Sequence, residues 1–287
     1  MESEKLVSFR GTELSSAEAD ALKDLEKLVQ KRISLEDRVS RRTQFGFCAH
    51  QGHVIKIGCY QCGLTELPES LGDLKYLEEI FLQGNSLESL PESIGNLKLL
   101  NFFLLSENKI THLPDSICEL SNLIQLELNR NKIEELPNSI GKLTKLKDLN
   151  ASSNNLQTLP DSIGNLRSLE VLSARNNSLS YLPDSIGNLM NLEELYLKNN
   201  HLKALPKSIG KLKSLEFLDL GGNELQSLPD SLIELHLLEK IIIARNQFIE
   251  FPEPLFYLPS LKYLTFDKKQ REIFRDEIKR LESHEIM

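Results

Sequence analysis

The sequence contains no tryptophan, only three methionines and four cysteines, and no excess of basic residues. Its 287 residues include 34 lysines and arginines against 42 aspartates and glutamates, which gives a formal net charge of −8. Since nucleic-acid-binding proteins present a basic surface, this balance argues against a nucleic-acid partner. No apolar run reaches the ~20 residues of a membrane-spanning helix, and the first ten residues lack the apolar stretch of a secretory signal. We therefore expect a soluble cytoplasmic protein with no membrane partner.

Leucine, in contrast, is abundant, with 56 residues, and it recurs with a fixed period. The pattern L-x-x-L-x-L-x-x-N-x-L-x-x-L-P repeats every 23 residues and keeps asparagine and proline in one register. The asparagines are Asn85, Asn108, Asn131, Asn154, Asn177, Asn200, Asn223 and Asn246. The prolines are Pro68, Pro91, Pro114, Pro137, Pro160, Pro183, Pro206, Pro229 and Pro252. Counting from Val54, with Cys62 in the first asparagine position, the array has nine units.

Each unit combines a short strand with a turn that returns the chain to the next strand. Alternation at positions such as Leu195, Tyr196 and Leu197 predicts a strand whose leucines point inward and whose middle residue points outward. Proline at the first helical position, followed by apolar residues at spacings of three as in Ile163 and Leu166, predicts a helical or 3₁₀ turn. Stacked units bury their leucines together, and the asparagine amides should form a ladder of hydrogen bonds to the backbone.

This pattern resembles the leucine-rich repeat family. The LPxSIGxL half of each unit, as in residues 159–166, is similar to the 23-residue intracellular class of that family. That class includes Ras-suppressor-type scaffolds and prokaryotic and archaeal proteins. The expected fold class is α/β. It is a curved solenoid with a parallel β-sheet on the concave face, short helical or 3₁₀ turns on the convex face and helical caps at both ends. The resemblance implies a protein partner, with a small GTPase or another signalling protein as the partner class.

The array occupies residues 54–260 and leaves an extension at each end, residues 1–53 and 261–287. In the first, Ser15 and Glu18 form a capping-box signature, and apolar residues at spacings of three and four predict an amphipathic helix over residues 15–33. We expect Phe45 and Phe47 to cover the first unit. At the other end a tenth unit begins, but Lys269 stands in its asparagine position. A last helix should begin near Asp267 and bury the stripe formed by Phe274, Ile278 and Leu281.

One group of residues has the chemistry of a metal or redox site. It comprises Cys48, His50, His53, Cys59 and Cys62. Cys59 and Cys62, however, occupy a leucine position and an asparagine position of the repeat, so both have structural roles, and Cys118 replaces a turn glycine. We favour core cysteines, with a metal or thiol-dependent site as the alternative. The absence of clustered cysteines near the termini favours a reducing compartment.

No catalytic motif interrupts the array, so we expect neither an enzyme nor a cofactor. The outward strand positions are free of the core pattern, and aromatic and charged side chains there are typical of protein interfaces. The predicted partner-binding residues are Phe81, Phe102, Leu104, Glu127, Arg175, Tyr196, Lys198, Phe217, Asp219, Ile242 and Tyr263. Aromatic pairs such as Tyr196 and Phe217 could instead cover one another across strands. The sequence therefore predicts a monomeric, non-enzymatic protein-binding scaffold, with a self-assembling structural protein as a further alternative.

Overall fold

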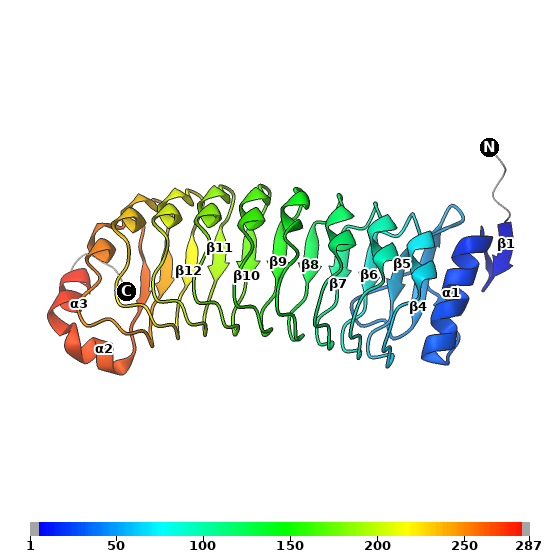
Figure 1. Cartoon of the computed structure of the whole chain (residues 1–287), viewed down its shortest axis with the longest axis horizontal. Helices are drawn as coiled ribbons and strands as arrows, with labels where there is room; N and C mark the ends of the chain where they lie inside the picture. The colour runs from blue at the N-terminus through cyan, green and yellow to red at the C-terminus, as the bar shows by residue number, and fades with distance from the viewer. Residues whose placement is uncertain (1–5, 283–287) are drawn as a thin grey trace. The chain divides into compact units, whose positions relative to one another are not determined.

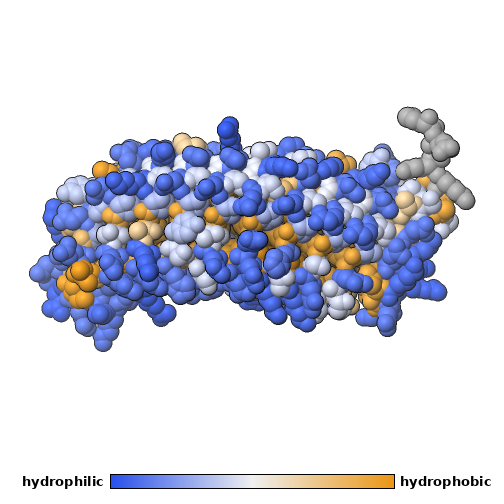
Figure 2. All heavy atoms as spheres, viewed as in Figure 1, coloured by the Kyte–Doolittle hydropathy of each residue, from blue (hydrophilic) through white to orange (hydrophobic). Residues whose placement is uncertain are grey.

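The computed structural model describes residues 6–282, which form two compact units that divide between Leu146 and Lys147. Both units repeat the same element, a three-residue strand followed by a 3₁₀ turn (Figure 1). No helix in the described range is long and apolar enough to span a bilayer. Hydrophilic side chains cover most of the face seen in Figure 2, with hydrophobic residues gathered in a narrow band among them.

The first unit holds the N-terminal cap and the first repeats. Its elements are β1 (Leu6–Phe9), β2 (Thr12–Ser15), α1 (Ser16–Val29), β3 (Ser34–Leu35), β4 (Gly46–His50), β5 (His53–Gly58), η1 (Glu69–Asp73), β6 (Glu79–Phe81), η2 (Glu92–Asn96), β7 (Phe102–Leu104), η3 (Asp115–Glu119), β8 (Gln125–Glu127) and η4 (Ile140–Lys142). Strands β5 to β8 pair in parallel in sequence order, whereas β4 pairs antiparallel with β5, and β1 and β2 form a separate hairpin.

The second unit continues the array and ends in two short helices. Its elements are β9 (Asp148–Asn150), η5 (Asp161–Asn165), β10 (Val171–Ser173), η6 (Asp184–Asn188), β11 (Glu194–Tyr196), η7 (Lys207–Lys211), β12 (Phe217–Asp219), η8 (Asp230–Glu234), β13 (Lys240–Ile242), η9 (Glu253–Tyr257), β14 (Tyr263–Thr265), α2 (Lys268–Ile273) and α3 (Arg275–Glu282). Strands β9 to β14 pair in parallel, and each residue pairs with the one 23 positions later, as Leu172 does with Leu195.

The inward leucines and the asparagine ladder confirm the repeat interpretation. The middle residue of each strand is buried, and the residues on either side of it point to the opposite face, which we call the sheet face. Asn200 shows the ladder: its amide nitrogen donates to the carbonyl oxygens of Leu197 and Ala174, both at 2.9 Å, and its amide oxygen accepts from the Leu179 backbone at 3.0 Å. One side chain thus satisfies backbone groups of two adjacent repeats.

The 3₁₀ turns are confirmed, but the expected position of proline is wrong by one residue. Pro160 precedes the turn in an extended conformation, and its carbonyl accepts the first turn hydrogen bond from Ile163 at 2.9 Å. Proline is therefore the N-cap and does not occupy the first helical position. The turn glycines have the predicted close-packing role: a Cβ on Gly164 would collide with the Ser185 carbonyl oxygen.

The N-terminal cap contains the predicted helix together with strands that we did not predict. Ser15 and Glu18 form the expected capping box, and Glu18 also accepts a 3.0 Å hydrogen bond from the Val54 backbone, which joins α1 to β5. The helix ends at Val29 because Gln30 adopts a left-handed conformation, so the predicted end at residue 33 is wrong. Phe47 is fully buried on β4 as expected, whereas Phe45 is only partly buried.

The C-terminal cap closes the last repeat with an aromatic cluster. Asp267 and Gln270 form a capping box at the start of α2, as the sequence indicates. The predicted stripe of Phe274, Ile278 and Leu281 is buried, but Phe274 caps the end of α2, so two helices stand where we expected one. The ring of Phe274 packs against those of Phe251 and Phe266. The domain boundaries at residues 53 and 260 stay predictions.

Candidate functional site

The sheet face of the second unit carries two adjacent aromatic rings with a cation packed on each. The guanidinium carbon of Arg175 lies 4.0 Å from the ring centroid of Tyr196. The Tyr196 and Phe217 rings meet edge to face with centroids 4.9 Å apart, and the Lys240 ammonium lies 5.1 Å from the Phe217 centroid. We call these four residues the aromatic–cation cluster. Each cation–π contact contributes about 0.5–1 kcal/mol at an exposed site, which favours this arrangement of rings and cations before any partner binds.

Asp219 fixes one end of this cluster. Its carboxylate forms a 3.2 Å ion pair with the Arg175 guanidinium and accepts a 3.2 Å hydrogen bond from the Gly221 backbone, while its side chain is only 3% exposed. We expected Asp219 to be a surface contact, and its burial contradicts that. On β12 it lies directly beside Tyr196 of β11 in the parallel register, and Arg175 bonds its carboxylate. Asp219 therefore positions Arg175 and is not itself presented to a partner.

Tyr196 is held as a neutral phenol. Burial, and then the hydrogen bond from its hydroxyl to the Glu194 carboxylate, raise the pKa of Tyr196 to about 12. The hydroxyl therefore remains protonated at neutral pH and serves as a hydrogen-bond donor. Tyr196 thus combines an aromatic surface with a fixed polar edge, a combination that is enriched in protein interfaces.

The remaining predicted residues of the second unit flank the aromatic–cation cluster. Lys198 is exposed, Ile242 is partly buried, and Tyr263 is 57% exposed on the last strand. Arg175, Tyr196 and Phe217 are also partly exposed. Their positions on the sheet face are as the sequence indicates, and their contact with a partner stays a prediction. Lys240 was missed, although its outward position in the repeat register could have identified it.

The sheet face of the first unit is occupied by the chain itself. After β3, residues 36–43 cross the strands, and we call this segment the strap. Val39 at its centre is 5% exposed and packs in a cluster with Cys48, Phe81 and Leu104, beside the partly buried Ile55 and Phe102. The expectation that Phe81 and Leu104 are exposed is therefore wrong, because the strap covers them. Phe102 retains only partial exposure.

Arg41 extends the strap to β8. Its guanidinium donates to the Glu127 carboxylate at 3.1 Å and to the Gln125 side chain at 3.1 Å. Glu127, a predicted partner contact, is thus already paired within the first unit. The contribution is modest, because an exposed ion pair contributes about 0.2–1 kcal/mol and burial of a valine about 1.5–3 kcal/mol. The strap is held mainly by one apolar side chain.

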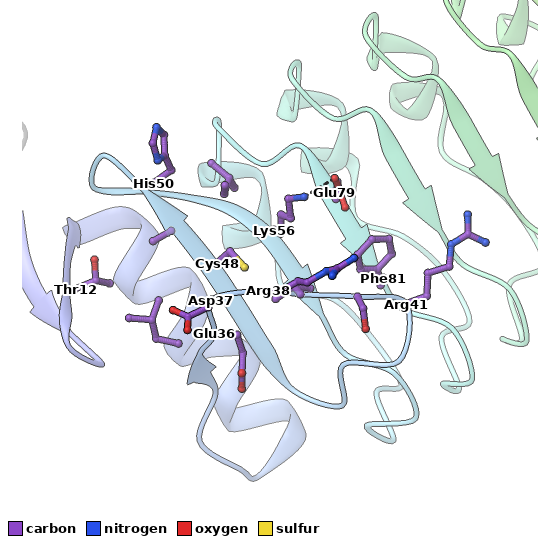
Figure 3. A pocket seen from close by; sticks show the side chains of 15 residues that line it. Thr12, Glu36, Asp37, Arg38, Arg41, Cys48, His50, Lys56, Glu79 and Phe81 are labelled. Carbon is purple, nitrogen blue, oxygen red and sulfur yellow. Dashed lines mark hydrogen bonds and ion pairs between the residues drawn. The ribbon is translucent and has the colours of Figure 1, made fainter.

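A pocket of about 710 Å³ lies between the strap and β4, β5 and β6 (Figure 3). Arg38 and Arg41 lie on its strap side, and Cys48, Lys56 and Glu79 line its sheet side. The ammonium of Lys56 and the carboxylate of Glu79 form a 2.7 Å ion pair, so they neutralise one another. The pocket results from the way the strap passes over the strands.

The cysteines and histidines of the alternative metal or thiol site do not converge. Cys48 lies in the strap cluster, His50 is exposed, and His53 stacks on Tyr76 with ring centroids 3.7 Å apart. Within residues 6–282 no three His, Cys, Asp or Glu side chains are placed to hold one metal ion.

Cys59 and Cys62 contact each other as free thiols. Burial raises the pKa of Cys59, whereas the hydrogen bond from Cys59 lowers the pKa of Cys62. The Cys62 thiol donates to the backbone carbonyl of Gln44. Both residues keep the places that the repeat predicts, the first in the core and the second at the start of the ladder.

Comparison with known families identifies the repeat over most of the chain. The leucine-rich repeat region family matches residues 93–182 and 176–284, and the leucine-rich repeat family matches residues 76–97. A leucine-rich repeat protein of Leptospira interrogans is 31% identical, with a TM-score of 0.59, and the match covers 75% of this chain and 69% of that one. No curated protein matches the sequence significantly.

Receptor ectodomains have a similar fold. The ectodomain of the Arabidopsis thaliana receptor kinase GASSHO1/SCHENGEN3, solved with CASPARIAN STRIP INTEGRITY FACTOR 2, is 26% identical with a TM-score of 0.61, and the match covers 80% of this chain and 32% of that one. Toll of Drosophila, solved with Spatzle, is 23% identical with a TM-score of 0.66, covering 74% and 32%, which shows the fold alone. The chain therefore spans about a third of these receptors.

Proposed function

The chain belongs to the leucine-rich repeat proteins, and on that premise we propose that it is a non-enzymatic scaffold that binds a protein partner through the sheet face of its second unit. The observation that carries this proposal is the aromatic–cation cluster of Arg175, Tyr196, Phe217 and Lys240. Preordered aromatic and arginine side chains lose little conformational entropy on binding, and such residues dominate the energy of protein interfaces.

The kind of ligand that similar proteins bind supports this use of the surface. The GASSHO1/SCHENGEN3 ectodomain is solved with CASPARIAN STRIP INTEGRITY FACTOR 2, PEPR1 with AtPEP1, and the plant peptide hormone receptor RGFR1 with RGF2. In this chain, Lys198 and Lys240 add positive charge beside the rings, so a partner segment with an aromatic or aliphatic residue next to a carboxylate would fit.

We further propose that the protein acts in the cytoplasm as a monomer, in signalling of the small-GTPase type. The resemblance to the 23-residue intracellular class suggests this partner class. The four free cysteines, two of them in contact, support a reducing compartment. Light scattering over a range of concentrations tests the monomer, and reversible self-association would instead favour a structural role. Zinc bound at one equivalent in the purified protein would favour the alternative metal site.

Affinity capture followed by paired substitutions tests the binding surface. Partners captured from native extract by the wild-type chain are identified, and each is then measured against Phe217→Ala and against Tyr181→Ala. Tyr181 is 54% exposed and lies outside the strands, so it controls for the loss of an exposed ring. We expect Phe217→Ala to weaken binding at least tenfold and Tyr181→Ala to leave it unchanged. Equal partner affinity of the two variants would mean that the sheet face of the second unit is not the binding surface.

A further inference from the structure

The strap has the form of a bound peptide. It enters at β4, where the Glu36 backbone donates to the Phe47 carbonyl at 2.8 Å, and it leaves beside β5, where the Tyr60 backbone donates to the Thr43 carbonyl at 3.0 Å. Between these points it reaches as far as Gln125 and Glu127 on β8 through Arg41. A single segment thus touches side chains from β4 to β8, which is the path that an extended ligand would take across a sheet.

The strap is attached by backbone hydrogen bonds at its two ends. Between them it is held mainly by the side chains of Val39 and Arg41 and by a hydrogen bond between the Val39 backbone and the Cys48 side chain. Every strap residue except Val39 is exposed or only partly buried. In the described part of the chain, Arg41 makes the one ion pair between the strap and a strand. Among residues 6–282, no backbone–backbone hydrogen bond joins residues 37–42 to a strand. The covered surface, in contrast, is strongly apolar, since Phe81 and Leu104 are buried and Phe102 and Ile55 lie beside them.

We propose that the strap is a displaceable internal ligand, and that the surface beneath it binds an extended segment of a partner protein with the same chemistry. The segment carries a branched aliphatic residue, which takes the place of Val39 against Phe81 and Leu104. An arginine two positions later takes the place of Arg41 on Glu127. This surface lies wholly within the first unit, so the inference does not depend on the proposed function of the second.

The strap itself specifies this ligand. The apolar site accepts one small branched side chain, and a carboxylate and an amide oxygen on β8 lie where a guanidinium binds in the native chain. A tethered segment competes at an effective concentration in the millimolar range, so a free segment of the same affinity binds weakly until the strap is loosened. A partner must therefore either bind more tightly than the strap or meet a chain whose strap has been released.

A labelled peptide of residues 34–45 tests the proposal in trans on the full chain. In the Val39→Asp variant the new carboxylate is disfavoured in the apolar cluster, which should release the strap. Leu237→Asp introduces the same charged residue at an exposed leucine of the second unit and serves as the control. By fluorescence anisotropy we expect the peptide to bind Val39→Asp at least tenfold more tightly than it binds wild type or Leu237→Asp. A peptide with glutamate in place of Arg41 should lose that gain.

Three results would overturn the proposal. The first is equal peptide affinity for all three chains, and the second is equal affinity of the peptides with arginine and with glutamate at the position of Arg41. The third is a concentration-dependent dimer of Val39→Asp in sedimentation, which would make a second copy of the chain the occupant. If Val39→Asp does not fold by circular dichroism, Arg41→Glu replaces it. Arg41 is well exposed, so that substitution removes the ion pair without disturbing the core. It should still raise peptide affinity severalfold, and an unchanged affinity would count against the strap as a ligand.

Discussion

In the first unit, the outward apolar side chains of Phe81 and Leu104 lie under residues 36–43. In the second unit, Tyr196 and Phe217 pack against each other and against neighbouring cations, and both remain partly exposed. The cores of the two units are built alike, with the same inward leucines and the same asparagine ladder. The sheet faces of the two units therefore differ in what covers them.

This difference separates two roles for the same repeat position. Where a distant segment covers an outward residue, as at Leu104, that residue becomes part of a core and contributes to stability. Where only local side chains surround it, as at Phe217, its apolar surface remains available to a partner. A sheet-face residue of such a repeat is therefore assigned to binding or to stability by what packs over it, and not by its position in the repeat alone.

The largest expected difference in unfolding free energy is between the variants Leu104→Ala and Phe217→Ala. Leu104 is fully buried, and a buried leucine replaced by alanine loses about 2–5 kcal/mol of unfolding free energy. Phe217 is partly exposed, so its loss removes about 1 kcal/mol from the aromatic pair while weakening partner binding. Urea denaturation of both variants measures the difference. Equal destabilisation by the two substitutions would mean that the strap does not bury Leu104.

A smaller difference in lost stability is expected when the two sheet-face arginines, Arg175 and Arg41, are each replaced by alanine. Arg175→Ala leaves the carboxylate of the buried Asp219 with only the Gly221 backbone as donor, and we expect a loss of about 1–3 kcal/mol. Arg41→Ala removes an exposed ion pair and should cost less than about 1 kcal/mol. Thermal unfolding of the two single variants checks the order. The double variant Arg175→Ala/Asp219→Asn should recover part of the first loss, since no buried charge is then left unpaired.

Periodicity was sufficient to predict the array. The spacing of Leu195, Asn200 and Pro206 follows from each repeat packing on its neighbour, so the inward strand residues, the asparagine ladder and the turns could be predicted from one repeat and extended to the others. The two capping boxes were predictable for a related reason, because the hydrogen bonds that form them join residues only three apart.

The strap was not predictable in this way. Val39 stands alone among polar residues and reaches Leu104, 65 positions later, through a contact that no local pattern encodes. The hairpin of β1 and β2 and the antiparallel strand β4 were not predicted for the same reason, since the N-terminal extension lies outside the repeat. Lys240 differs from these, because its outward position follows from the repeat register and only its contact with Phe217 required the structure.

The smallest expected effect concerns the protonation of Tyr196. Its pKa of about 12 in the folded chain lies above the ordinary value of 10. Between these values the unfolded chain releases the phenolic proton while the folded chain keeps it, so the contribution of Tyr196 to stability is complete below pH ~10 and declines as the pH rises towards ~12. Tyr196→Phe removes the ionisable hydroxyl, and its urea midpoint should fall less steeply over that interval than that of wild type. If Tyr196→Phe instead follows wild type, the phenol is accessible to water in the folded chain, and the aromatic–cation cluster is looser than its distances indicate.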